Sequence, residues 1–123
     1  MGLDLRSVFD TNILIDYLWG RKQAVEIIKN AEKPIISIVT FIEVMAGVKK
    51  DKEKSVRKFL ESFESVDVTS EIAEIAIKIR RQTRLKLPDA IIWATAKTRE
   101  VILITRDDGF PREIDISTPY RLH

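Results

Sequence analysis

Acidic residues lie beside several short apolar runs of this sequence, at Asp10, Glu43, Asp89, Asp107 and Asp108. Carboxylate oxygens are the ligands that Mg²⁺ and Mn²⁺ prefer. A divalent ion held by them can activate water and stabilise a phosphoryl transition state. Acids that meet in a fold repel one another unless a cation neutralises them. If these acids converge, the set predicts metal-assisted hydrolysis of a phosphodiester.

The composition removes most other chemistries. The 123 residues include no cysteine, and the only histidine is the last residue, His123. Disulfides, thiol catalysis and thiolate metal sites are therefore excluded, and a histidine-centred triad has no basis. The net charge of +2 is too small to indicate a nucleic-acid-binding protein by itself.

Each acid also has a purely structural interpretation. Asp10 is a good helix N-cap, and Thr40 to Glu43 matches a capping box in which the glutamate folds back onto the helix start. Asp89 follows a proline at a helix start, where an acid suits the helix dipole. Residues 107–109, Asp-Asp-Gly, form a common turn sequence. No single acid is by itself diagnostic of a metal site, so the prediction of metal-assisted hydrolysis depends on all of these acids together.

Short β-branched runs alternate with longer helical patterns. We predict strands at residues 7–9, 35–39, 66–68, 101–104 and 114–117. We predict helices at residues 13–18, 23–30, 40–48, 55–63, 70–85 and 90–97, the last buried, with Trp93 in the core. The alternation indicates a three-layer α/β fold, with a central, mainly parallel sheet of about five strands flanked by helices. Ligands in such folds bind beyond the carboxyl ends of the strands, where these acids converge.

Four blocks of the sequence resemble, in order, the signature of the PIN-domain family, especially the VapC-type toxins of toxin–antitoxin pairs. They are FDTNILIDYL (9–18), ISIVTFIEVMAGV (36–48), LPDAIIWATA (87–96) and VILITRDDGF (101–110). The resemblance covers nearly the whole chain, so we expect residues 1–123 to form a single PIN-like domain. It implies a Mg²⁺- or Mn²⁺-dependent endoribonuclease whose products carry a 5′-phosphate and a 3′-hydroxyl.

The resemblance also assigns roles to the acids. The catalytic and metal-binding residues that it implies are Asp10, Glu43, Asp89 and Asp107. Supporting or substrate-contacting groups are Thr11, Asn12, Thr105 and Asp108. Many relatives carry an acid where this chain has Gly109. Whether Asp107 or Asp108 supplies the fourth carboxylate therefore stays open.

The resemblance implies an RNA substrate, a cognate antitoxin and a homodimer. Relatives bury an antitoxin segment in a groove near the positions of Tyr17 and Trp19. The basic stretch at residues 80–86 is either an RNA-backbone contact or a solvated helix end. No apolar run approaches the ~20 residues that span a bilayer, so we expect no membrane partner and a cytoplasmic location.

Alternative functions remain. The chain could be a PIN-domain RNA-processing nuclease without an antitoxin, or a non-catalytic RNA-binding or scaffold domain. A phosphatase or phospho-acceptor that uses Asp10 as nucleophile is disfavoured, because one such family needs an acid at position 12, which is Asn. Another needs an acidic pair upstream, and Asp10 lies too near the start.

Overall fold

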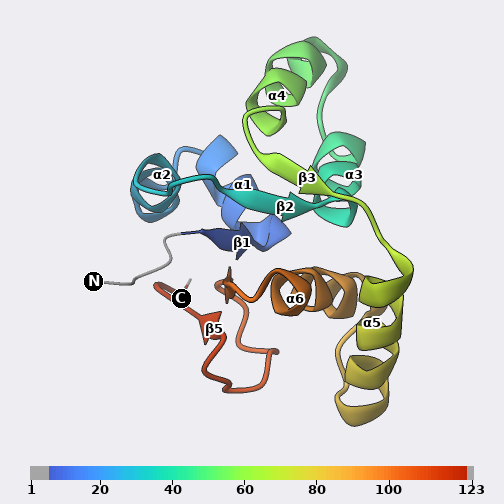
Figure 1. Ribbon diagram of the computed structural model, residues 1–123. Helices are drawn as coiled ribbons and strands as arrows, with labels where there is room; N and C mark the ends of the chain where they lie inside the picture. Colours follow the sequence, from blue (N-terminus) through green and yellow to red (C-terminus); the bar gives the residue numbers. More distant parts are fainter. Residues whose placement is uncertain (1–5, 122–123) are drawn as a thin grey trace.

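A five-stranded parallel sheet forms the middle layer of the protein in the computed structural model, which describes residues 6–121 (Figure 1). The strands are β1 (Ser7–Phe9), β2 (Ile35–Ser37), β3 (Glu64–Val66), β4 (Ile102–Ile104) and β5 (Ile116–Ser117). Their order is β3-β2-β1-β4-β5, and every neighbouring pair is parallel. The order reverses between β1 and β4, so this is the topological switch point where open α/β sheets bind ligands. The predicted fold class is confirmed.

Helices cover both faces of the sheet (Figure 1). They are α1 (Thr11–Leu18), α2 (Lys22–Lys29), α3 (Ile38–Ala46), α4 (Glu53–Leu60), α5 (Ser70–Gln82) and α6 (Leu87–Arg99), with a short 3₁₀ helix at Lys50–Lys52. None of the helices within residues 6–121 has the length and apolar character needed to cross a membrane.

Two hydrophobic clusters form the core, because successive strand residues point to opposite faces. Val8 packs with α5 and α6, whereas the next residue, Phe9, packs with α1 to α4. Strands covered on both faces are continuously apolar, which is why the short runs lack polar alternation. Trp93 of α6 is only 4% exposed, and its predicted place in the core is confirmed.

The start of α3 differs from the prediction, and the difference matters for the site. The strand predicted to run to residue 39 ends at Ser37, whose hydroxyl accepts a hydrogen bond from the Val39 amide and caps α3. Thr40 therefore lies inside the helix, and the capping box with Glu43 is wrong. Since neither side chain is used at the helix start, both are available to contact α1.

The other boundaries differ by a few residues. The third strand covers residues 64–66 instead of 66–68, and α6 begins at Leu87 instead of residue 90. Pro88 in the first turn fits this earlier start, because proline has no amide hydrogen to leave unpaired there.

Candidate active site

Asp10 lies at the switch point, between the end of β1 and the start of α1. Its amide donates to the Ile104 carbonyl at 2.9 Å, which extends the β1–β4 pairing by one residue. Its Oδ1 accepts from the Thr11 amide at 2.7 Å, and its Oδ2 accepts from the Thr105 hydroxyl at 2.8 Å and from Asn12 Nδ2 at 3.3 Å. The side chain therefore caps α1, as the structural interpretation predicts, and is also fixed against the end of β4.

The pKa of the Asp10 carboxyl is raised from 3.8 to about 6, chiefly by burial of the group. The hydrogen bond from Thr105 opposes this rise, and the negative charges of Asp89 and Asp107 add to it. Asp10 is only 4% exposed, so water screens its charge poorly. A cation close to this carboxylate would relieve both the burial cost and the repulsion.

Asp89 occupies the first turn of α6 and is half-buried. Its pKa is raised by burial and then by the charges of Asp107 and Glu43, while Lys86 opposes the rise. Among residues 6–121 no group donates a hydrogen bond or forms an ion pair with its carboxylate. The oxygens of Asp89 are therefore available to a ligand.

Glu43 projects from α3 toward α1. Its Oε1 lies 2.6 Å from the Thr11 hydroxyl, which in turn lies 3.0 Å from the buried Thr40 hydroxyl. The shift of the helix start described above makes this contact possible, because Glu43 does not fold back onto its own helix. Thr11 thus holds Glu43 on the side of α1 that carries Asp10.

The two consecutive acids after β4 have different surroundings, although both are exposed. Asp107 accepts from the Gly109 amide at 2.8 Å, and its own amide donates to the Thr105 hydroxyl at 3.0 Å. Asp108 instead forms an ion pair with Arg121. Because the charge of Asp107 adds to the rise in pKa that burial causes at Asp10 and Asp89, it is Asp107 that belongs electrostatically to the set.

Asp16 is a site-supporting residue that the sequence analysis missed. It lies in the middle of α1 and is 2% exposed. Its Oδ2 accepts from Arg106 Nε at 2.6 Å and from the Tyr120 hydroxyl at 2.7 Å, and its Oδ1 lies 3.3 Å from Arg21 Nε. The available signal was an aspartate inside an otherwise apolar helical stripe, since a buried acid requires partners.

The four acids thus share one end of the sheet and influence one another, yet they do not form a compact cage. Within the described part of the chain, no three acidic or histidine side chains are arranged as a ready-made metal site. In the basic stretch at residues 80–86, Arg80 donates to the Leu85 carbonyl at 3.1 Å across the turn between α5 and α6.

A groove of about 510 Å³ is bordered by α1, α3 and α4, and Glu43 of α3 lines it. Its apolar lining includes Ile15, Leu18 and Trp19, of which Trp19 is 81% exposed. Tyr17, by contrast, stacks on Phe59 with ring centroids 4.4 Å apart and belongs to the packing of α1 against α4. We call this feature the α1–α4 groove.

Comparison with known proteins shows which family the chain belongs to. The family model of the PIN domain matches residues 7–113 of this chain. A toxin–antitoxin complex from Klebsiella pneumoniae contains a chain that is 39% identical, with a TM-score of 0.89, over 94% of this chain and 99% of that one. Ribonuclease VapC19 of Mycobacterium tuberculosis is 29% identical over 93% of this chain and 99% of its own length. DNA-bound VapBC from Salmonella typhimurium shares the fold, with a TM-score of 0.75 at 21% identity over 92% of this chain and 96% of that one. The chain belongs to the PIN-domain family.

Proposed function

We propose that this protein is a metal-dependent endoribonuclease that hydrolyses RNA phosphodiester bonds and acts as the toxin of a toxin–antitoxin pair. The observation that carries the proposal is the electrostatic coupling of its acids. Asp89 and Asp107 help to raise the pKa of buried Asp10, and Asp107 and Glu43 help to raise that of Asp89. Membership of the PIN family and the similarity to a named ribonuclease support the same conclusion.

The donor set fits Mg²⁺ or Mn²⁺. Every candidate ligand is a carboxylate oxygen, and magnesium is commonly held by a few carboxylates while it keeps several waters, so a closed cage is not required. Asp10 and Asp89 are the proposed direct ligands, with Glu43 and Asp107 completing the set. A bound divalent cation supplies Lewis-acid activation of water and neutralises charge that develops on the phosphate.

The remaining residues of the site hold these carboxylates in place. Thr105 and Asn12 fix Oδ2 of Asp10, and Thr11 fixes Glu43. Thr105 also accepts from the amide of Asp107, so one hydroxyl touches two of the proposed ligands. We assign the fourth carboxylate to Asp107, because Asp108 is engaged with Arg121.

The α1–α4 groove is the proposed seat of an antitoxin segment. It combines exposed apolar side chains of α1, including Trp19, with Glu43 at its border. A polypeptide that fills it therefore lies against the proposed site and can block access of RNA. The similarity to a chain of a toxin–antitoxin complex at 39% identity supports this assignment.

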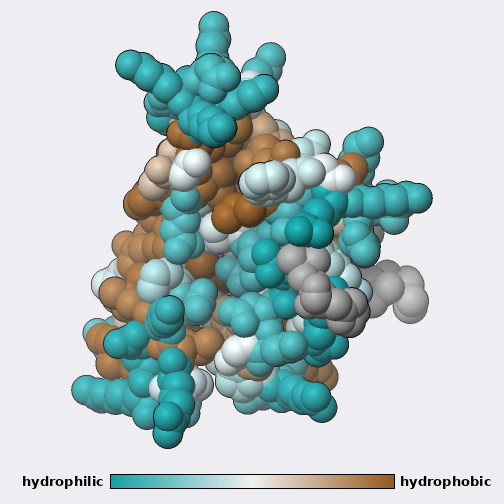
Figure 2. Space-filling model, turned by 180° about the vertical axis from the view of Figure 1, so that it is seen from behind, coloured by the Kyte–Doolittle hydropathy of each residue, from teal (hydrophilic) through white to brown (hydrophobic). Residues whose placement is uncertain are grey.

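A second apolar surface is the proposed interface between the two copies of a homodimer. Figure 2 shows hydrophobic surface along the side of the molecule that carries α5, on the left in that view. It includes the exposed side chains of Val68, Ile77 and Leu87, which line a hollow of about 430 Å³ with Arg80 and Arg81. Exposed apolar patches of this kind often mark protein–protein contacts.

Incubation of the purified protein with single-stranded RNA tests the function. We expect cleavage with Mg²⁺ or Mn²⁺ and none with EDTA. The double variant Asp10→Asn, Asp89→Asn should be inactive, whereas Asp67→Asn, which changes an exposed acid in the loop after β3, should match the wild type. Unchanged cleavage by the double variant would contradict the proposal.

A further inference from the structure

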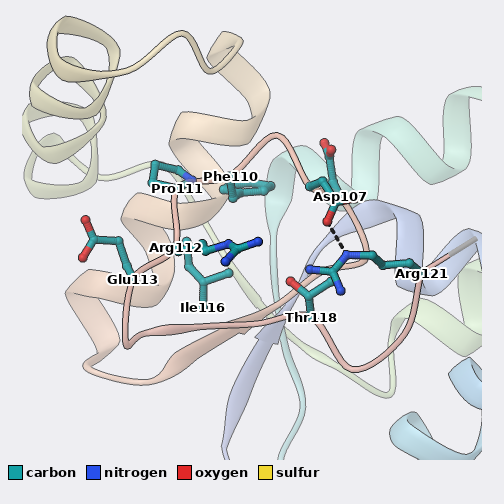
Figure 3. A pocket seen from close by; sticks show the side chains of 9 residues that line it. Asp107, Phe110, Pro111, Arg112, Glu113, Ile116, Thr118 and Arg121 are labelled. Atoms are coloured by element: carbon teal, nitrogen blue, oxygen red, sulfur yellow. Dashed lines mark hydrogen bonds and ion pairs between the residues drawn. The ribbon is translucent and has the colours of Figure 1, made fainter.

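A pocket opens beyond the carboxyl ends of β4 and β5, beside the four-acid set (Figure 3). Its volume is about 830 Å³, within the range of small-ligand sites. One wall includes Asp107, so the pocket adjoins the proposed active site. We call it the β4–β5 pocket.

The floor of the β4–β5 pocket is apolar and firmly packed. Phe110, Pro111 and Ile116 line it. Phe110 is 6% exposed and contacts Trp93 of α6 edge-on, with ring centroids 6.2 Å apart. A floor supported by a core tryptophan is rigid enough to receive the flat, weakly polar part of a ligand.

The charged lining of the pocket consists of two arginines, Arg112 and Arg121, and three acids, Asp107, Asp108 and Glu113. Arg112 extends across the pocket toward Arg121 in Figure 3, while Glu113 points away from Arg112. Within residues 6–121, Arg112 has no hydrogen-bond or ion-pair partner. Arg121 uses its Nε for the ion pair with Asp108, and its terminal nitrogens are not used in that pair. Asp108 therefore orients one guanidinium, and both retain donors for an incoming anion.

Guanidinium groups bind phosphate with paired, charge-assisted hydrogen bonds. The hydroxyl of Thr118, which also lines the pocket, adds a neutral donor. An apolar floor below cationic donors matches a nucleotide, whose base and sugar are less polar than its phosphate. The carboxylate of Asp107, on one wall of the pocket, accepts a hydrogen bond from the Gly109 amide at 2.8 Å.

We propose that the β4–β5 pocket binds one nucleotide of the RNA substrate next to the cleaved linkage, with Arg112 and Arg121 on its phosphate. This inference rests on the ribonuclease function proposed above and names a substrate subsite for it. Arg112 and Arg121 contribute to RNA affinity, and Asp108 acts as a positioning residue through Arg121.

Fluorescence anisotropy with a labelled single-stranded RNA oligonucleotide in EDTA measures binding without cleavage. Arg112→Ala should weaken binding about tenfold, and Arg112→Lys should restore part of the loss. The slope of log affinity against log salt should fall by about 0.7 for one lost phosphate contact. Lys58→Ala on α4 removes the same charge at an exposed position near the other edge of the sheet and should change neither quantity.

Steady-state cleavage in Mg²⁺ separates binding from chemistry. Arg112→Ala should raise KM with kcat within about twofold, and its melting temperature should equal that of the wild type because Arg112 is exposed. RNA oligonucleotides that carry a neutral methylphosphonate at one linkage each locate the phosphate that Arg112 contacts. At that linkage the substitution should weaken binding by the wild type but should not further weaken binding by Arg112→Ala. That position should differ from the cleaved linkage.

The two proposals fail separately. If Arg112→Ala and Lys58→Ala have the same RNA affinity in EDTA and the same KM in Mg²⁺, the subsite is overturned even though the enzyme cleaves RNA. If the wild type binds RNA through Arg112 but does not cleave it with any divalent cation, the ribonuclease function is overturned and the binding pocket is supported.

Discussion

Nε of Arg106 lies 2.6 Å from Oδ2 of Asp16, and this ion pair joins the middle of α1 to the loop after β4. Arg106 stands directly between Thr105, which binds Asp10, and Asp107. The loop after β4, which carries Thr105 and Asp107, is therefore fixed by Asp16. Asp16 is not a predicted metal ligand and is not adjacent to one in the sequence.

Asp16→Asn should destabilise the protein and reduce its activity. The asparagine keeps the shape but loses the charge that Arg106 and Arg21 require, and breaking a buried ion pair costs about 3–5 kcal/mol. Since Arg106 is partly exposed, we expect about 2–4 kcal/mol in urea unfolding. Asp51→Asn, at an exposed acid, should stay close to the wild type. An unchanged unfolding midpoint would show that the pair does not hold the loop.

The metal-free protein should become less stable as pH rises. The folded pKa of Asp10 is about 6, above the value of 3.8 expected when it is unfolded, so the folded state binds more protons between these values. The free energy of unfolding should therefore fall from about pH 4 to pH 6, by about 3 kcal/mol in total. Urea titrations in EDTA should detect the fall, and it should be smaller in Asp10→Asn, where the raised pKa of Asp89 remains. If the free energy of unfolding of Asp10→Asn had the same pH dependence as that of the wild type, the raised pKa would not belong to Asp10.

Added Mg²⁺ should stabilise the protein more at pH 7.5 than at pH 5. A cation binds the ionised carboxylate, and protonation of Asp10 near pH 6 competes with it. Melting temperatures measured with a series of Mg²⁺ concentrations give the effect at each pH. The double variant Asp10→Asn, Asp89→Asn should show no such shift. Equal shifts in the variant and the wild type would mean that magnesium binds elsewhere.

Thr11→Val should slow cleavage by displacing Glu43. Valine keeps the shape of threonine but lacks the hydroxyl that lies 2.6 Å from Glu43 Oε1, and we expect a loss of about 1 kcal/mol of stability. Thr98→Val on α6 removes a hydroxyl that donates to the Ala94 carbonyl at 2.9 Å, away from the acids. Both variants should lose similar stability, but only Thr11→Val should lower kcat. Equal kcat values in the two variants would leave Thr11 a purely structural residue.

Periodicity and strand-end position were sufficient to predict the sheet and its acidic edge, because both depend on local sequence. The start of α3 was mispredicted, because Ser37 and Thr40 are both good caps, and the strand ends at Ser37, the last residue of β2 that pairs with β3. The pairing of Asp16 with Arg106 joins residues 90 positions apart. The ion pair of Asp108 with Arg121, on which the proposed choice of Asp107 depends, likewise joins residues far apart in the sequence. Such long-range partners leave no periodic signal in a single sequence.

Gly109→Ala should impair catalysis by moving Asp107. An ideal Cβ at Gly109 would lie 3.1 Å from Asp107 Oδ1, which is tighter than ordinary contact, so the carboxylate must shift by a few tenths of an ångström. Gly47→Ala is the matched control, because its Cβ would meet its nearest neighbours at 3.8 Å. We expect Gly109→Ala to lower kcat several-fold with little change in melting temperature, since position 109 is exposed, and Gly47→Ala to leave kcat unchanged. A different outcome would assign the fourth carboxylate to Asp108. In that case Gly109→Ala would keep the wild-type kcat, and activity would be lost in Asp108→Asn but not in Asp107→Asn.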